Sequence, residues 1–310
     1  MTGRSVNPLT IYNFMAPARI SFDYTPFGQP VTWVAGVLVA SDDRSAFSAF
    51  GSGFLAAPDL AFTARHVVDE ISERFTGRPI HELTGQMPFG VQLATSDPST
   101  GKFLKWDVTN YHYSRNIDIT GLTIEPAEDL GQDFLMVLPR FDISPPPEGA
   151  AITAFGYPNT TSRQFGDGSY RVKLCPTTSR GVVREIHYQY RDRVMLPFPC
   201  MHTNARFDAG MSGGPVFNQD GRVCAVVATG METAREDGGH DSHASLIWPA
   251  FGLRFNDGQA TGQQNPPRFL RSDAEAGQIQ VLNLDYMSVE PSPDNCDRLR
   301  YAPPGPTPLN

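Results

Sequence analysis

The chain has 310 residues, of which 40% are hydrophobic and 19% are charged, which is the balance of a folded globular protein and not of a disordered one. Its formal net charge of −8 argues against a nucleic-acid partner, because binding to phosphate groups requires a basic face. No stretch approaches the ~18 uncharged apolar residues of a membrane span, so we expect no membrane partner.

The chain begins with residues 1–24, which we expect to form an N-terminal extension. Asn7, Asn13 and Arg19 interrupt the apolar residues of this region, whereas a secretory signal needs a continuous hydrophobic stretch. The sequence therefore contains no visible secretory signal, although a signal that had already been cleaved would leave no trace.

Short β-type segments follow, rich in branched and aromatic residues and separated by clusters of Gly, Pro, Asp and Ser. Asp220-Gly221 has the composition of a hairpin turn. Helical periodicity is scarce, and its best case covers residues 64–74. The expected strands are 31–40, 46–56, 91–95, 103–108, 117–124, 151–155, 170–174, 181–190, 194–197, 216–218, 223–229 and 245–248.

Residues 145–149, Pro-Pro-Pro-Glu-Gly, divide the chain near its middle and are typical of a linker. The many short strands on either side are typical of a β-sandwich or a β-barrel, and we place the first of two such units in residues 25–142 and the second, with the linker included, in residues 143–255. From residue 256 onward the composition shifts toward Gly, Gln, Asn and Pro. We therefore expect residues 256–310 to form a C-terminal extension that is partly disordered.

The most informative stretch of the chain is Gly210-Met211-Ser212-Gly213-Gly214. Glycines beside a serine let the backbone turn tightly, so that the N–H groups of Gly210 and Ser212 can converge on one oxygen. Acyl transfer by a serine needs such donors for its negatively charged intermediate, and it needs a base that activates the hydroxyl. The stretch therefore predicts Ser212 as a nucleophile, with an oxyanion hole formed by the backbone of Gly210 and Ser212.

A candidate base and a candidate carboxylate precede this serine in the chain. His66 stands in Thr-Ala-Arg-His-Val and Asp118 stands in Asn-Ile-Asp-Ile. In such a set the histidine transfers the proton of the serine and the carboxylate orients the histidine. Each residue also has an ordinary structural interpretation: a serine in a turn, a histidine at a helix start and an aspartate that caps a strand. Their joint occurrence favours the catalytic interpretation.

These motifs resemble the chymotrypsin/trypsin-like serine peptidase family, in its bacterial form close to the HtrA-like proteases. The family pattern G-x-G-F followed by T-A-x-H-V matches residues 51–67. The family segment around the aspartate matches residues 118–122, with departures at Thr120 and Gly121. Residues 203–212 match the length of the family's nucleophile loop, and the order His, Asp, Ser is that of the family.

The resemblance implies an all-β fold of two six-stranded antiparallel β-barrels of the chymotrypsin type, with the active site in the cleft between them. It implies a serine endopeptidase that cleaves protein or peptide substrates through an acyl-enzyme intermediate, without a cofactor. His66, Asp118 and Ser212 would form its catalytic triad. Residues 256–310 are too few for the PDZ domain that often follows such a core.

The resemblance also implies which residues contact the substrate. Ala228, Thr229 and Gly230 match the segment that pairs with a bound peptide as an added β-strand. Arg206 and Phe207 match the residues that line the pocket for the side chain preceding the cut. Arg206 would either pair with an acidic side chain or turn outward and leave Phe207 to shape a small apolar pocket, and we take the apolar pocket as the default.

Histidines and cysteines of the second half invite a metal interpretation, which needs three or four ligands in a closed geometry. His240 and His243 stand in a polar stretch that favours a solvated loop. The spacings of Cys200-Met201-His202 with Cys175 and Cys224 do not fit a zinc site well. We therefore expect no metal, and whether any two of the three cysteines pair is left open.

Position 67 bears on the location of the protein, because many secreted members of the family carry a disulfide cysteine directly after the histidine. This chain has Val67 there. Together with the lack of a visible signal, this favours a reducing, cytoplasmic location.

Two other functions stay open at this point. The fold could serve as a binding or regulatory module, against which the complete set of three residues argues. The same residues could form an esterase, against which the peptide-pairing segment 228–230 argues. A regulatory protein partner of unknown identity is compatible with the peptidase.

Overall fold

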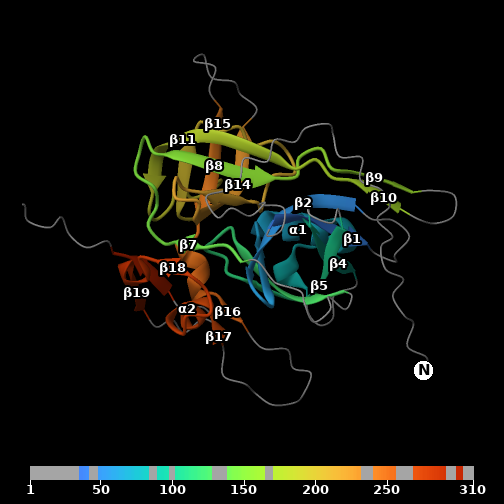
Figure 1. The fold of residues 1–310 in the computed structure, drawn as a ribbon, viewed down its shortest axis with the longest axis horizontal. Helices are drawn as coiled ribbons and strands as arrows, with labels where there is room; N and C mark the ends of the chain where they lie inside the picture. The colour runs from blue at the N-terminus through green and yellow to red at the C-terminus, as the bar shows by residue number, and fades with distance from the viewer. Residues whose placement is uncertain are drawn as a thin grey trace, which may run out of the picture.

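Two β-barrels lie side by side in the computed structural model of the chain (Figure 1). The structure describes residues 35–41, 48–83, 89–97, 102–127, 138–164, 170–231, 240–255, 268–290 and 298–302. The expected N-terminal extension, residues 303–310 and Cys296 lie outside these ranges. Within them, no helix has both the length and the apolar character that a membrane crossing requires.

The first barrel is closed by six strands in the order β1-β2-β3-β6-β5-β4. The helix predicted at residues 64–74 is confirmed as α1 (Arg65–Thr76), which buries Val67 and Ile71 against the barrel core and is followed by the 3-10 helix η2 (Ile80–Glu82). The strands are β1 (Ala35–Ser41), β2 (Ser48–Ala57), β3 (Leu60–Thr63), β4 (Gly90–Asp97), β5 (Lys102–Tyr113) and β6 (Thr120–Pro126).

Strands β2 and β3 are buried on both faces, and they lie where the two barrels meet. Leu55 and Ala61 belong to the core of the first barrel, whereas Phe54 and Phe62 belong to the hydrophobic cluster that continues into the second. A strand that is buried on both faces has no alternation of polar and apolar residues. β3 in addition has only four residues, and it is absent from the strands expected from the sequence, whereas the longer β2 is among them.

The second barrel consists of six antiparallel strands, because β13 pairs with both β8 and β14. Gly221, with a φ of 70°, forms the predicted turn between β13 and β14. The predicted fold class, two β-barrels of the chymotrypsin type, is confirmed. The six strands are β8 (Ala151–Gly156), β11 (Thr177–His187), β12 (Cys200–Thr203), β13 (Pro215–Phe217), β14 (Val223–Met231) and β15 (Asp241–Leu246).

The strand expected at residues 194–197 is wrong, and after β11 the chain returns to the barrel only at β12. Asp192 Oδ1 accepts the backbone N–H groups of Val194 and Met195 at 2.9 and 2.6 Å, so this segment forms a turn. Pro197 has no N–H to donate to a sheet. Branched residues alone therefore gave a misleading strand signal here.

Further elements extend the second barrel. β7 (Phe141–Asp142) and β18 (Val281–Leu282) pair in parallel beside β14, which is an addition to the antiparallel barrel expected from the sequence. β9 (Thr161–Gln164) and β10 (Tyr170–Lys173) form a separate hairpin. The remaining elements are η3 (Trp248–Gly252), β16 (Arg254–Phe255), β17 (Arg268–Phe269), α2 (Leu270–Glu275), η5 (Leu284–Tyr286), β19 (Met287–Glu290) and β20 (Arg298–Tyr301).

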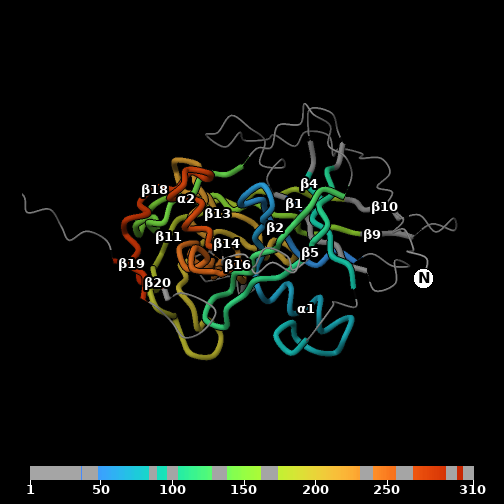
Figure 2. Tube along the Cα trace, turned by 90° about the horizontal axis from the view of Figure 1, so that it is seen from below, coloured from blue at the N-terminus to red at the C-terminus, as the bar shows by residue number. Residues whose placement is uncertain are grey.

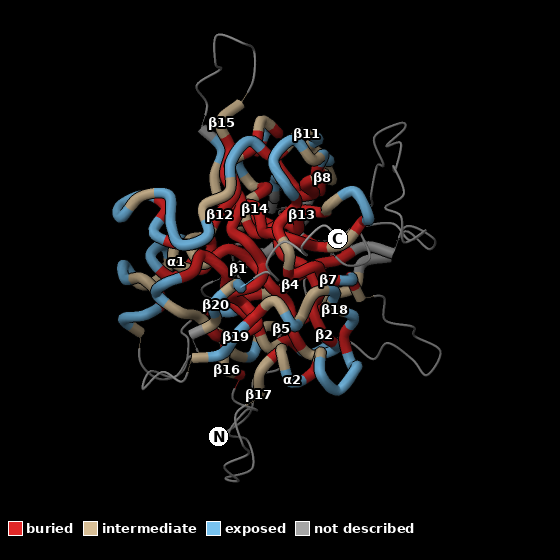
Figure 3. Tube along the Cα trace, turned by 90° about the vertical axis from the view of Figure 1, so that its left-hand side faces the viewer, coloured by how far each residue is buried: buried red, intermediate tan, exposed pale blue. Residues whose placement is uncertain are grey.

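The C-terminal elements are anchored to both barrels. α2 buries Leu270 in the hydrophobic cluster of the second barrel. Arg268 binds Asp273 at 2.7 Å and also Asp59, in the turn between β2 and β3 of the first barrel, at 2.5 Å. Figure 2 shows β18, β19 and β20 at the end of the molecule away from α1, and Figure 3 shows the buried residues concentrated in the strands of the barrels.

Candidate active site

His66 is held in place by Asp118, which comes from the loop before β6. His66 is the second residue of α1, and the residue that caps this helix, Ala64, has no side-chain acceptor for the free N–H groups of the first turn. Asp118 Oδ1 accepts the backbone N–H of His66 at 3.1 Å, and Asp118 Oδ2 lies 2.8 Å from His66 Nδ1. One carboxylate therefore fixes both the backbone and the ring of His66.

The two side chains differ in their access to solvent. The Asp118 side chain is 5% exposed, whereas the His66 side chain is 43% exposed and faces the cleft. Burial lowers the pKa of His66, but the hydrogen bond and the negative charge of Asp118 raise it, and the net result is a pKa above that of a free imidazole. Asp118 therefore favours the protonated form of the ring.

Ser212 lies in a loop whose shape depends on two glycines in the left-handed region. Gly210 has a φ of 93° and Gly213 a φ of 87°, and a Cβ on Gly213 would lie 2.1 Å from the carbonyl oxygen of Ser52. The Ser212 hydroxyl donates to the carbonyl of Ala228 at 3.2 Å. Among the described residues, no group accepts a hydrogen bond from the backbone N–H of Gly210 or Ser212.

Ser52 was not among the predicted site residues, yet it connects the first barrel to this loop. Its hydroxyl donates to the carbonyl of Gly210 at 2.7 Å and accepts the N–H of Tyr157 at 2.9 Å. Its backbone N–H donates to the carbonyl of Ser212 at 2.8 Å. The sequence does carry a sign of this contact, which is a small polar residue between Gly51 and Gly53. A glycine is needed at position 51 because a Cβ there would lie 2.9 Å from the carbonyl oxygen of Ser212.

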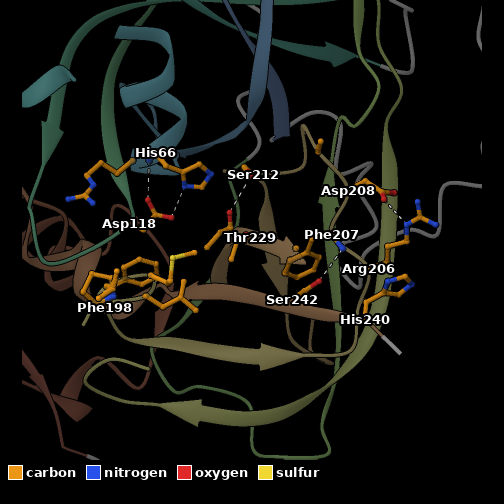
Figure 4. Close-up of a pocket in the computed structure, with 18 residues that line it drawn as sticks. His66, Asp118, Phe198, Arg206, Phe207, Asp208, Ser212, Thr229, His240 and Ser242 are labelled. Carbon is orange, nitrogen blue, oxygen red and sulfur yellow. Dashed lines mark hydrogen bonds and ion pairs between the residues drawn. The ribbon is translucent and has the colours of Figure 1, made fainter. Parts of the chain in front are cut away.

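His66, Asp118 and Ser212 all line one cleft of about 740 Å³. Figure 4 shows His66 and Asp118 on one side of this cleft, Ser212 near its centre, and Arg206 with Asp208 on the far side. The structure therefore brings together the three residues that the sequence singled out. The first and the last of them, His66 and Ser212, are 146 positions apart in the chain.

One edge of β14 is open along the cleft. Thr229 and Gly230 pair with β15 on one side, whereas β13 pairs only with residues as far as Val226 on the other. Ala228 lies at the irregularity in the pairing with β15, and all three residues line the cleft. The predicted segment 228–230 thus has one edge without a strand partner among the described residues.

Arg206 and Phe207 point in different directions. Arg206 is 64% exposed and its Nε lies 2.6 Å from Asp208 Oδ1. Phe207 is buried, and its backbone N–H donates to the hydroxyl of Ser242 at 3.3 Å. A Cβ on Gly230 would lie 2.2 Å from the carbonyl oxygen of Phe207, so this wall of the cleft requires a glycine opposite it.

A family model described as a trypsin-like peptidase domain matches residues 51–226, which is more than half of the chain. The chain belongs to this family. The matched range of the trypsin-like peptidase domain contains His66, Asp118 and Ser212 and ends within β14. The prediction of a chymotrypsin/trypsin-like peptidase is thereby confirmed at the level of the family.

Several solved structures resemble this trypsin-like peptidase domain. The Rv3671c protease from M. tuberculosis in its active form is 17% identical with a TM-score of 0.47, covering 87% of this chain and 97% of its own. Deg5 is 16% identical with a TM-score of 0.46, covering 68% and 83%. The serine endoprotease from Yersinia pestis is 17% identical with a TM-score of 0.43, covering 70% and 61%. None of the curated protein sequences matches this chain.

The histidines and cysteines that were considered as metal ligands are not grouped around a common point in the part of the chain that the structure describes. His243 lies buried in β15, stacked on the His202 ring at 5.0 Å, so the prediction of a solvated loop is wrong for this residue. His202 Nε2 binds Asp241 Oδ1 at 2.8 Å. In the described part of the chain no group of His, Cys, Asp and Glu is placed to hold a metal ion, and Cys175, Cys200 and Cys224 are free thiols.

Proposed function

We propose that this chain is a serine endopeptidase in which His66, Asp118 and Ser212 act together on a peptide bond. Ser212 attacks the carbonyl carbon while His66 takes the proton of its hydroxyl and then passes it to the leaving amine. Asp118 stabilises the imidazolium that forms in between. Water hydrolyses the resulting acyl-enzyme, again with His66 as the base. No step of this sequence requires a cofactor.

The observation that carries this proposal is the hydrogen bond between the side chains of Asp118 and His66. It lies at the wall of the cleft that Ser212 also lines. In this structure the Ser212 hydroxyl donates to the Ala228 carbonyl, and the contact between a nucleophile and its base often forms or tightens only when substrate is bound. The free N–H groups of Gly210 and Ser212 support an oxyanion hole at the same place.

The open edge of β14 favours a peptide over a simple ester as the substrate. An extended peptide can add to Thr229 and Gly230 as a further strand through main-chain hydrogen bonds, which an ester without a peptide backbone lacks. The same edge leaves the choice of side chains to the pockets around it.

A fluorophosphonate probe tests this function directly, because it reacts with an activated serine hydroxyl. We expect the full chain to be labelled at Ser212 and the Ser212→Ala variant to stay unlabelled. Equal labelling of the two proteins would contradict the proposal, since another residue would then be the nucleophile.

The activity should depend on the protonation of His66. Only neutral imidazole can act as the base, and Asp118 raises the pKa of His66 above that of a free imidazole. We therefore expect kcat/KM to fall as the pH drops through this pKa and to level off above it. A pH–rate profile of the full chain checks this, and a profile that stays flat from pH ~5 to ~8 would speak against a histidine base.

The side chain preceding the cut is expected to be small and apolar. Arg206 is exposed and already paired with Asp208, which leaves the buried Phe207 to shape the pocket. In a peptide library varied at this position, the preference for Ala, Val or Leu should survive Arg206→Ala. Phe207→Ala is the matched change on the same loop and should broaden the preference. A preference for Glu that disappears in Arg206→Ala would contradict this assignment.

A further inference from the structure

A second groove of about 740 Å³ lies beside the catalytic cleft and has a different chemical character. Three aromatic side chains line it, together with Pro197, Pro199 and Pro249. Its lining comes from the loop before Asp118, from the segment between β11 and β12, from η3 and from the C-terminal strands. The aromatic residues are Tyr188, Trp248 and Tyr301.

The aromatic side chains contact one another, with Tyr188 exposed and Trp248 only 6% exposed. The rings of Tyr188 and Tyr301 are stacked with their centroids 5.3 Å apart and an interplanar angle of 12°. Trp248 lies on Tyr301 at 6.3 Å. The Tyr301 hydroxyl forms a hydrogen bond with the Ser144 hydroxyl at 3.0 Å, which fixes the orientation of the Tyr301 ring. Tyr188 remains 47% exposed.

The groove offers no net charge to a ligand. Among its described lining residues only Glu290 and Arg300 are charged, and they bind each other at 3.0 Å. These features favour an uncharged, apolar ligand.

The groove adjoins the catalytic cleft at Pro197, which lines both. The segment before this proline forms the rim of the cleft and presents Val194 and Met195 to solvent. Asp192 holds both of their backbone N–H groups, so the rim is an ordered turn with exposed apolar side chains. A polypeptide in the cleft can therefore continue over an apolar surface into the groove.

We propose that this groove, defined by Tyr188, Trp248 and Tyr301, binds a proline-rich segment of the polypeptide substrate at a distance from the bond that is cut. This inference rests on the proposed peptidase function. A proline-rich chain adopts an extended left-handed helix without internal hydrogen bonds, so its carbonyl groups are free and its rings can pack on aromatic faces. Its preformed shape lowers the entropy cost of binding, and its lack of charge matches the lining.

Two substrates that differ only in a proline-rich extension test the proposal with the full chain. Both contain the same cleavable core, and the extension, Pro-Pro-Ala-Pro behind a flexible linker, is placed on either side of the core in separate peptides. We expect the extension on one side to lower KM by about tenfold with kcat unchanged, because the second contact is made within one molecule. An equal KM for all peptides would overturn the proposal.

Tyr188→Ala and Tyr190→Ala form a matched pair of variants for this experiment. Both tyrosines are exposed, at 47% and 43%, but Tyr190 does not line the groove. Tyr188→Ala should remove the gain in KM and leave cleavage of the unextended core unchanged, whereas Tyr190→Ala should keep the gain. A gain that persists in Tyr188→Ala would assign the extension to another surface and overturn the proposal.

Direct binding separates this inference from the peptidase function. A fluorescent proline-rich peptide is titrated into the full-length Ser212→Ala chain, and fluorescence anisotropy is expected to show binding that Tyr188→Ala weakens about tenfold. Binding without any cleavage by the wild type would overturn the peptidase function and support the groove. No binding would overturn the groove.

The chain's own residues 303–308 are rich in proline and could compete for the same groove. A full-length variant with Ser in place of Pro303, Pro304, Pro306 and Pro308 distinguishes this case. Equal binding of the free peptide to both proteins supports a substrate segment as the ligand. Binding that is seen only in the substituted protein would assign the groove to the chain's own tail and overturn the proposal.

Discussion

Ser212→Ala is expected to remove peptidase activity and to leave the fold intact. The loss in kcat should be on the order of a millionfold, because neither His66 nor Asp118 can act as the nucleophile in place of Ser212. The hydroxyl makes a single hydrogen bond, to the Ala228 carbonyl at 3.2 Å, so its removal should change the free energy of unfolding by no more than about 1 kcal/mol. Turnover of a peptide substrate and a thermal melt measure the two effects.

Ser242→Ala is the matched control for this variant. Ser242 also lines the cleft, but its hydroxyl accepts the N–H of Phe207 and lies in the pocket wall. We expect this change to raise KM by about tenfold at most and to leave kcat within about tenfold of the wild-type value. If Ser212→Ala retains more than a trace of the wild-type turnover, Ser212 is not the nucleophile.

The positions of His66, Asp118 and Ser212 could be anticipated because each stands in a short stretch of restricted composition. The glycines around Ser212 are required by φ angles of 93° and 87°, and the small residues around Ser52 by the close approach of the two barrels. Such constraints are local, so they leave a mark in the sequence. The repetition of short strands between turns indicates a sandwich or a barrel, and the resemblance of the motifs to the family decides for two barrels.

The features that sequence analysis missed depend on contacts between distant residues. β3 has no polar face, because it is buried between the barrels, and the segment at 194–197 is folded into a turn by Asp192. His243 is buried only because β12 brings His202 against it. The aromatic groove forms only because Tyr188 and Tyr301 stack on one another, and these residues are 113 positions apart in the chain.

Asp118→Asn is expected to reduce kcat by roughly four orders of magnitude without unfolding the chain. Asp107→Asn is its matched control, because Asp107 is the nearest other aspartate before the candidate site and lies on β5, where it accepts a hydrogen bond from Gln92 at 2.6 Å. Asp107→Asn should keep its activity within about threefold of the wild type. Loss of activity in Asp107→Asn with no loss in Asp118→Asn would reverse the assignment.

The size of the effect at Asp118 follows from the two bonds that its carboxylate makes. One oxygen accepts the backbone N–H of His66, which is a donor in every protonation state, so an asparagine must keep its carbonyl oxygen there. Its NH₂ group then faces Nδ1, at the position of the oxygen that lies 2.8 Å away in the wild type. Nδ1 must become the acceptor, which moves the proton to Nε2, and the nitrogen that should take the proton of Ser212 is blocked. Raising the pH cannot restore the base, because the neutral ring itself holds the wrong tautomer, and kcat of Asp118→Asn should stay low across the pH range in which the wild type is active.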